Sequence, residues 1–356
     1  MKLPHLSIAR KSFLGVDIGT SAIKIVELSK LGDRKKLDNY GEMQSSHVYE
    51  KPFRTFDKST LNLSDHDIVR AILAILGEAK MKTNRAYFSI PDFSTFFTNF
   101  KLPSMTEEEV PPAVQYEARR HIPLPLSEVT LDWQIIGKAI KDRKLNDFDI
   151  LLVAVPNEVV RQYQEIANAC RLELLALEAE VFGLARALSE KKEGVLTLID
   201  IGARSTTINI VDGGIVKISH SFDTSGNDFT SLVARSLNID YQAAEELKRK
   251  KGLLYQTTNE LRSAIMPTTD LVVNEVKKIL QNFYQTENKE PQKVILAGGS
   301  AFLPGLVDYF SKELAKPIEV ANPFAPLYYP PILENNLKEM GPAYAIAVGA
   351  ALRGLE

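Results

Sequence analysis

Several features are scarce in this 356-residue sequence, and each absence removes a class of function. A single cysteine, Cys170, leaves no internal disulfide and no multi-cysteine metal site, and its apolar surroundings predict a buried structural thiol. No apolar run approaches the roughly 20 residues that cross a bilayer, and residues 1–12 lack the apolar region of a signal peptide. A net charge of −2 gives no basic excess for nucleic acid. We therefore expect a cytoplasmic protein without a nucleic-acid partner and without direct membrane insertion.

Two similar strand–turn–strand segments stand out against this background. In residues 14–28 apolar residues alternate on both sides of a turn that contains Asp17 and Gly19, and residues 198–210 repeat this pattern around Asp200. Glycine lets a backbone approach a ligand closely and point its amides at oxyanions. A carboxylate in such a turn cannot bind phosphate itself, but it can hold Mg²⁺ through water.

The second copy decides between two interpretations of the first. Residues 14–28 alone fit a polar hairpin without a ligand as well as they fit a phosphate site. Two copies about half a chain apart instead indicate two similar domains that face each other across one nucleotide. The sequence has neither a GxxxxGK[ST] loop nor a GxGxxG fingerprint, so opposed hairpins would hold that nucleotide.

The rest of the chain predicts an α/β fold with additions. Residues 92–152 have a cluster of phenylalanines, a helix and two strands, which suggests a small subdomain inserted in the first domain. Residues 240–285 are strongly helical. A strand at 293–297 runs into the glycine turn Gly298–Gly299, and residues 343–352 form a helix whose alanines and glycines permit close packing.

This order of elements resembles the actin-like ATPase fold of actin, sugar kinases, heat-shock chaperones and the division protein FtsA. Residues 17–24 and 200–205 resemble its two phosphate segments, 295–305 resembles its adenosine segment, and 343–351 its second connecting helix. The resemblance implies two duplicated α/β domains around a nucleotide cleft.

Within that superfamily the chain resembles the PilM family of type IV pilus assembly proteins. The resemblance rests on residues 115–125, with their Ile-Pro turn, on the Asp-aromatic-Gln strand at 131–134, and on the closing stretch 347–353. It implies an FtsA-type inserted subdomain and the following division of the chain: first domain 12–82, 156–196 and 338–356; inserted subdomain 83–155; second domain 197–239 and 290–337; helical subdomain 240–289.

The resemblance also implies a site for ATP and Mg²⁺, the latter held by Asp17 and Asp200 through water. Residues in the two hairpins would contact the phosphates: Gly19, Thr20, Ser21, Lys24, Gly202 and Ser205. Residues of the helical subdomain and the glycine turn would contact the nucleoside: Glu245, Lys248, Gly298, Gly299 and Ser300. Glu178 stands where chaperone relatives carry a carboxylate near the hydrolytic water.

Two departures from the family pattern favour binding over fast turnover. Ala203–Arg204 replaces a glycine-rich run, and Ser225–Gly226 replaces a glycine pair. We expect ATP binding with, at most, slow hydrolysis.

The implied function is pilus assembly, or the related type II secretion, at the cytoplasmic side of the inner membrane. The implied partner is the cytoplasmic N-terminal peptide of PilN, in a groove between the first domain and the inserted subdomain, and the pilus motor ATPases are further partners. Nucleotide state would be coupled to this membrane platform through domain closure.

Two alternatives have the same fold. A small-molecule kinase would need a general base in the cleft, and no convincing aspartate is evident for that role. An FtsA-like filament protein would use a C-terminal amphipathic helix on the membrane, and we do not expect one after residues 353–356.

Overall fold

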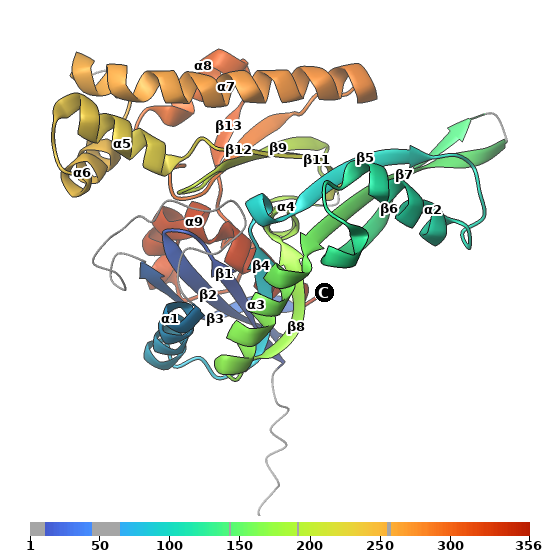
Figure 1. Ribbon diagram of the computed structural model, residues 1–356. Helices are drawn as coiled ribbons and strands as arrows, with labels where there is room; N and C mark the ends of the chain where they lie inside the picture. Colours follow the sequence, from blue (N-terminus) through green and yellow to red (C-terminus); the bar gives the residue numbers. More distant parts are fainter. Residues whose placement is uncertain (1–10, 45–64, 142–143, 191, 255–257) are drawn as a thin grey trace, which may run out of the picture.

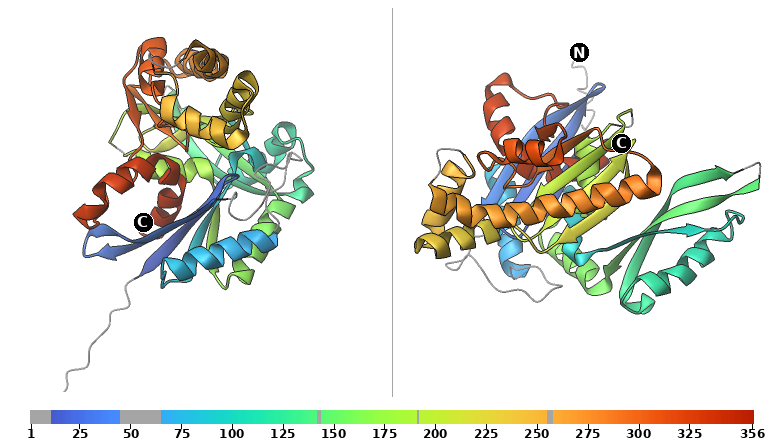
Figure 2. Two further views of the ribbon diagram at one scale, coloured as in Figure 1. Left: turned by 90° about the vertical axis from the view of Figure 1, so that its left-hand side faces the viewer. Right: turned by 90° about the horizontal axis from the view of Figure 1, so that it is seen from above.

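The computed structural model describes residues 11–44, 65–141, 144–190, 192–254 and 258–356 (Figure 1). Two five-stranded sheets lie one above the other, and a third sheet extends from them as an arm. Figure 2 shows that this arm projects to one side of the two larger sheets, with its own helix.

The two large sheets share one topology. The first has the order β3-β2-β1-β4-β8 and the second β11-β10-β9-β12-β13. In each, three antiparallel strands are followed by two parallel ones. The first contains β1 Ser12–Ile18, β2 Ala22–Leu31, β3 Arg34–Gln44, β4 Arg85–Ile90 and β8 Glu173–Ala179, and the second β9 Val195–Ile201, β10 Thr206–Asp212, β11 Ile215–Phe222, β12 Lys293–Ala297 and β13 Ile318–Val320. The predicted α/β duplication is confirmed.

Helices cover the sheets on both faces. The first sheet packs against α1 (Asp65–Glu78) and α3 (Asn157–Ala169), whose apolar stripes include the buried Ile72 and Tyr163. The outer face of the second sheet carries α5 (Gly226–Leu237), α6 (Tyr241–Lys251), α7 (Asn259–Glu287) and α8 (Leu306–Leu314).

Two helices lie between the large sheets, and they cross at a glycine contact. These are α4 (Glu180–Leu188) and α9 (Glu334–Arg353). A Cβ added at Gly349 would lie only 1.8 Å from the carbonyl oxygen of Gly183, so only glycine fits there. The Ala/Gly-rich helix predicted at 343–352 is therefore confirmed, and it packs closely as its composition predicted.

The arm is a three-stranded sheet of order β5-β7-β6, made of β5 (Phe96–Leu102), β6 (Val129–Lys141) and β7 (Lys144–Pro156). Helix α2 (Val110–His121) packs on it through Val114 and Ala118. Within the described part of the chain, β6 has no strand on its outer side.

The arm begins later than the sequence suggested. We placed the start of the inserted subdomain at residue 83, but β4 pairs in parallel with β1 inside the first sheet, so the arm's first strand is β5. The remaining elements are short 3-10 turns, at Asp92–Ser94, Leu126–Glu128 and Pro331–Leu333. The division into domains, with this shift, remains a proposal.

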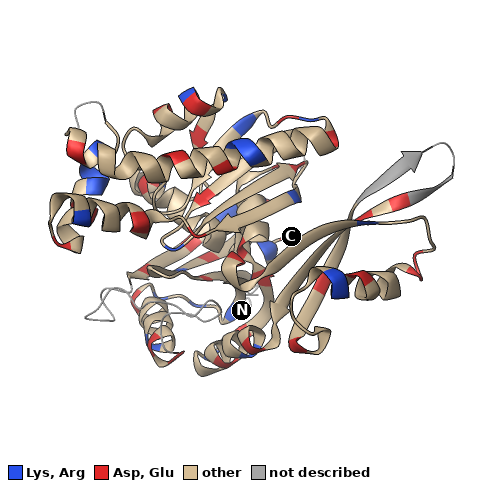
Figure 3. Ribbon diagram, turned by 45° about the horizontal axis from the view of Figure 1, so that its top comes forward, with Lys and Arg blue, Asp and Glu red and all other residues tan. Residues whose placement is uncertain are grey.

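The distribution of charged residues and the burial of Cys170 agree with what the sequence predicted. Figure 3 shows lysines and arginines mixed with aspartates and glutamates along α7. Cys170 is buried, and burial raises the pKa of its thiol to about 11. Across the ranges that the structure describes, no helix is both long and apolar enough to cross a membrane.

Candidate functional site

The turns of the two hairpins have the same backbone geometry. In the first, the amide of Gly19 donates to the carbonyl of Ala22 (3.1 Å), and in the second the amide of Gly202 donates to Ser205 (3.0 Å). The strand registers also match, since Asp17 lies opposite Lys24 and Asp200 lies opposite Thr207. The repeat seen in the sequence is thus a repeat of turn geometry and of carboxylate position.

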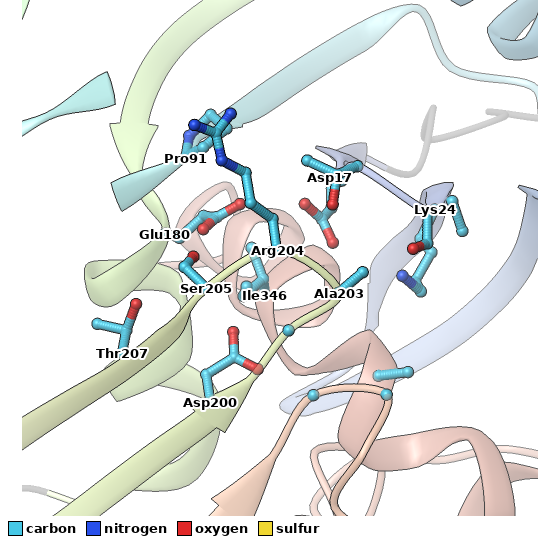
Figure 4. Close-up of a pocket in the computed structure, with 18 of the residues that line it drawn as sticks. Asp17, Lys24, Pro91, Glu180, Asp200, Ala203, Arg204, Ser205, Thr207 and Ile346 are labelled. Atoms are coloured by element: carbon cyan, nitrogen blue, oxygen red, sulfur yellow. The ribbon is translucent and has the colours of Figure 1, made fainter. Parts of the chain in front are cut away.

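These turns face one cavity of about 130 Å³ between the large sheets. Figure 4 shows that Asp17, Glu180 and Asp200 reach this space from three different elements, while Arg204 extends toward Pro91. The structure brings ten of the predicted site residues together here: Asp17, Gly19, Thr20, Ser21, Lys24, Asp200, Gly202, Ser205, Gly298 and Gly299.

Of the two aspartates, Asp17 is the one whose ionised form is better stabilised by neighbouring groups. Burial raises its pKa, whereas the charge of Lys24 and a hydrogen bond from Ser89 (Oγ to Oδ1, 3.2 Å) lower it, and Glu42 raises it slightly. Ser89 stands beside Asp17 on the parallel strand β4. This carboxylate therefore has a cation and a donor within the protein.

The ionised form of Asp200 is less well stabilised by its neighbours. Its pKa is raised to about 7, first by burial and then by the charges of Asp17 and Asp92, while the charge of Lys24 has the smallest effect and lowers it. Its neighbour on β12 is Ala297, followed by Gly298, where a Cβ would lie 2.3 Å from Asp200 Oδ1. The glycine, with φ of +85°, is required by this close approach.

The sequence analysis missed two further acids, Glu180 and Asp92. Burial raises the pKa of Glu180 well above its usual value, and the charges of Asp17, Asp92 and Asp200 add to that rise. Burial likewise raises the pKa of Asp92 to about 6, against a hydrogen bond from Thr207. The amide of Asp92 donates to Glu180 (3.4 Å). The only sequence signal for Glu180 was its place in the first turn of a helix.

This donor set fits a hydrated divalent cation. Three carboxylates with raised pKa values, those of Asp17, Glu180 and Asp200, line the cavity, and a positive charge among them would favour their ionised forms. No three described His, Cys, Asp or Glu residues are grouped closely enough to cage a metal directly. Mg²⁺ commonly keeps several waters and binds through one or two carboxylates and phosphates, which suits this arrangement.

Glu178 does not reach the cavity. Its carboxylate forms two hydrogen bonds with Arg186 (2.6 and 2.8 Å) and one with Arg353 (2.8 Å), and it lines a different pocket. Strand β8 ends one residue later and α4 begins, so the chain turns Glu180 into the cavity in its place. Of these two glutamates, the cavity is lined by Glu180 and not by the predicted Glu178.

Three other predicted residues lie outside the cavity lining. Lys248 is buried and donates to the carbonyl of Gly226 (3.0 Å) and to Thr230 (2.8 Å), and it pairs with Glu245 at 2.6 Å. Ser300 is also buried, behind Gly226. These residues brace the helices next to the cavity, and their contact with a nucleoside remains a prediction.

A second, larger cavity of about 730 Å³ runs between the arm and the first sheet. The consecutive residues Thr130–Gln134 of β6 line one wall, and Phe182 and Arg186 of α4 line the other. Side chains alternate between the faces of a strand, so five consecutive lining residues show that this groove follows the edge of β6. We call it the β6 groove.

Duplicated sheets around a cavity with two phosphate-type hairpins define an actin-like fold. Solved structures agree: MreB5 of Spiroplasma citri bound to ADP has a TM-score of 0.54 at 13% identity, over 96% of this chain and 95% of that one. Cell division protein FtsA of Staphylococcus epidermidis is 19% identical over 87% of this chain and 74% of its own length.

A more specific match names the family. Residues 15–355 match the family described as type IV pilus assembly protein PilM, and the chain belongs to that family. The structure of a PilM–PilN type IV pilus biogenesis complex has a TM-score of 0.82 and 27% identity, covering 96% of this chain and 98% of that one. The resemblance inferred from the sequence is confirmed.

Proposed function

We propose that this protein binds ATP with Mg²⁺ between its hairpins and the cytoplasmic N-terminal peptide of PilN in the β6 groove, and so links nucleotide state to the pilus platform. The observation that carries the proposal is the pairing of a carboxylate-rich cavity with a separate groove along a strand edge. The similarity to the structure of a PilM–PilN type IV pilus biogenesis complex supports the choice of partner.

In the nucleotide site, Mg²⁺ would neutralise phosphate charge, and Asp17 and Asp200 would orient its waters. The amides of the two glycine turns would meet the phosphates, and Lys24 would add a positive charge. The cavity is smaller than the roughly 300–1,000 Å³ of typical ligand sites. The closed arrangement therefore suits the phosphates, and the cleft must widen to admit a nucleoside.

Glu180, rather than Glu178, is the acid positioned to orient a hydrolytic water. Its raised pKa favours the neutral form until a cation arrives, and a neutral carboxyl group cannot take a proton from that water. We therefore propose at most slow hydrolysis and a role for ATP in holding the cleft closed.

In the β6 groove, an extended peptide can pair with the free edge of β6. Main-chain hydrogen bonds then give affinity, while side-chain pockets give selectivity. Trp133, Leu131 and Phe182 supply apolar walls, and the volume of about 730 Å³ suits several side chains. A peptide from an inner-membrane protein would hold this chain at the cytoplasmic face, in pilus or type II secretion assembly, where motor ATPases are further partners.

Titration of a fluorescent PilN N-terminal peptide against the purified protein tests this proposal. Trp133→Ala removes an apolar wall and should weaken binding at least tenfold, about the loss of one buried aromatic contact. Tyr116→Ala is the matched control, since Tyr116 is an exposed aromatic residue of the same arm outside the groove. Equal affinities for Trp133→Ala and wild type, or no binding by wild type, would contradict the peptide assignment.

A further inference from the structure

The same two helices line both cavities. From α4 and α9, the nucleotide cavity receives Glu180, Leu184, Pro342, Ala343 and Ile346, and the β6 groove receives Phe182, Arg186 and Arg353. Each helix therefore runs from one site to the other. A change in the angle between them must alter both sites, because neither wall is independent of this pair.

We propose that the α4–α9 crossing transmits occupancy between the nucleotide cavity and the β6 groove, and that Glu178, Arg186 and Arg353 are the positioning residues that hold it. This inference rests on the proposed function, since it assumes that both sites bind their ligands. It adds the physical connection between them.

The two helices are packed too closely at this crossing to slide past each other. Gly183 and Gly349 meet backbone to backbone, and Nη1 of Arg186 donates to the carbonyl of Gly349 (3.0 Å). Since close-packed interfaces shift between discrete arrangements rather than deform smoothly, this contact moves as a unit.

An ionic cluster fixes the groove end of the crossing. Glu178, only 8% exposed, accepts hydrogen bonds from Arg186 of α4 and Arg353 of α9 at 2.6 to 2.8 Å. Glu356 adds a contact to Arg186 Nε at 3.2 Å. One buried carboxylate thus ties the two helices together beside the proposed peptide site. All four side chains line that groove.

Two short connections link the α4–α9 crossing to the nucleotide cavity. Glu178 faces the groove and Glu180 faces the nucleotide cavity, with only the buried Ala179 between them. The amide of Gly298, in the glycine turn of the second sheet, donates to the carbonyl of Pro342 on α9 (2.9 Å). A ligand that draws in Glu180 therefore moves the cavity end of α4, and one that draws in the glycine turn moves the cavity end of α9.

The expected sign of this coupling is positive. A peptide that fills the groove fixes α4 and α9, and a nucleotide then binds to helices that are already ordered. Thermodynamic linkage requires the nucleotide to tighten peptide binding by the same factor.

Calorimetric titration of ATP with Mg²⁺, with and without saturating PilN N-terminal peptide, measures this factor. We expect wild type to bind ATP at least about fivefold more tightly with peptide, the lower end of typical coupling. In Glu178→Gln the ratio of the two ATP affinities should fall toward one, whatever the variant does to peptide affinity. Lys338→Gln is the control, since it breaks an exposed pair with Glu334 on the same helix α9, and should keep the wild-type ratio.

Arg353→Gln provides a milder variant, because this arginine side chain is 38% exposed and its loss leaves the Glu178–Arg186 pair intact. It should lower the ratio part of the way, and it carries the test if Glu178→Gln does not fold. A ratio of one in wild type, or a wild-type ratio in both variants, overturns the proposed coupling while leaving both binding sites in place. Failure of wild type to bind either ligand overturns the proposed function instead.

Discussion

The two phosphate-type hairpins have the same backbone but different electrostatic surroundings. Both place an aspartate before a glycine turn closed by one hydrogen bond of 3.0 to 3.1 Å. Asp17 then has Lys24 opposite and Ser89 alongside, whereas Asp200 has Thr207 opposite and Ala297 alongside. The two hairpins share one topology, but only Asp17 has a lysine on the opposite strand. We therefore predict that the second half depends more than the first on a cation from solution.

We expect the largest effect from removing the charge of Asp200, whose ionised form has fewer stabilising neighbours. The folded-state pKa of Asp200, about 7, lies above its ordinary value of 3.8, so its contribution to stability is present below pH 4 and lost as pH rises through 7. With neither Mg²⁺ nor nucleotide, Asp200→Asn should raise the free energy of unfolding at pH 8 by up to about 4 kcal/mol.

Denaturant unfolding at pH 5 and pH 8 checks this prediction. The difference in stability between the two pH values should shrink in Asp200→Asn. Asp212→Asn, at the exposed end of the same hairpin, is the control. An undiminished pH dependence in Asp200→Asn would show that the hairpins do not differ in this way.

A somewhat smaller effect is expected on ligand binding from Asp17. Asp17→Asn should weaken binding of ATP with Mg²⁺ about 100-fold, on the order of 3 kcal/mol for a lost charged contact. It should change affinity for ATP in EDTA much less, since the carboxylate acts through the metal. Calorimetry with Mg²⁺ and with EDTA separates the two. Unchanged affinity in Mg²⁺ would rule out Asp17 as a metal residue.

The smallest effect should come from the neighbouring strand. Ser89→Ala removes the hydrogen bond that lowers the pKa of Asp17, at a cost of about 1 kcal/mol, or roughly fivefold in Mg²⁺–ATP affinity. The corresponding position beside Asp200 is already alanine, so Ala297→Ser is the reciprocal change. It should leave Ser89→Ala unrescued, since it acts on the other carboxylate. Calorimetry of both variants and of the double variant provides the comparison.

Local pattern was sufficient for the hairpins and insufficient for the rest of the site. Asp17 and Asp200 were found because strand, turn and carboxylate lie within a few residues. The sequence pointed to Glu178 and not to Glu180, because the direction in which each side chain faces depends on where β8 stops and α4 starts, which tertiary packing decides.

The helical subdomain shows the same limit. The family resemblance assigned Lys248 to the nucleoside, and the structure adds that the rotation of α6 places it against Gly226 and Thr230. That rotation depends on packing against α5, the helix that precedes α6 in the chain. Asp92 was missed for a related reason, since the parallel pairing of β4 with β8 brings it beside Glu180.

The outer edge of β6 matters also to anyone who prepares this protein. Unpaired amides and carbonyls on a sheet edge are a template for another strand, including one from a second copy. Without the proposed peptide, we expect the edge of β6, as the described residues show it, to permit edge-to-edge self-association at high concentration. Co-expression with the peptide fused to a carrier would shield that edge during purification and crystallisation.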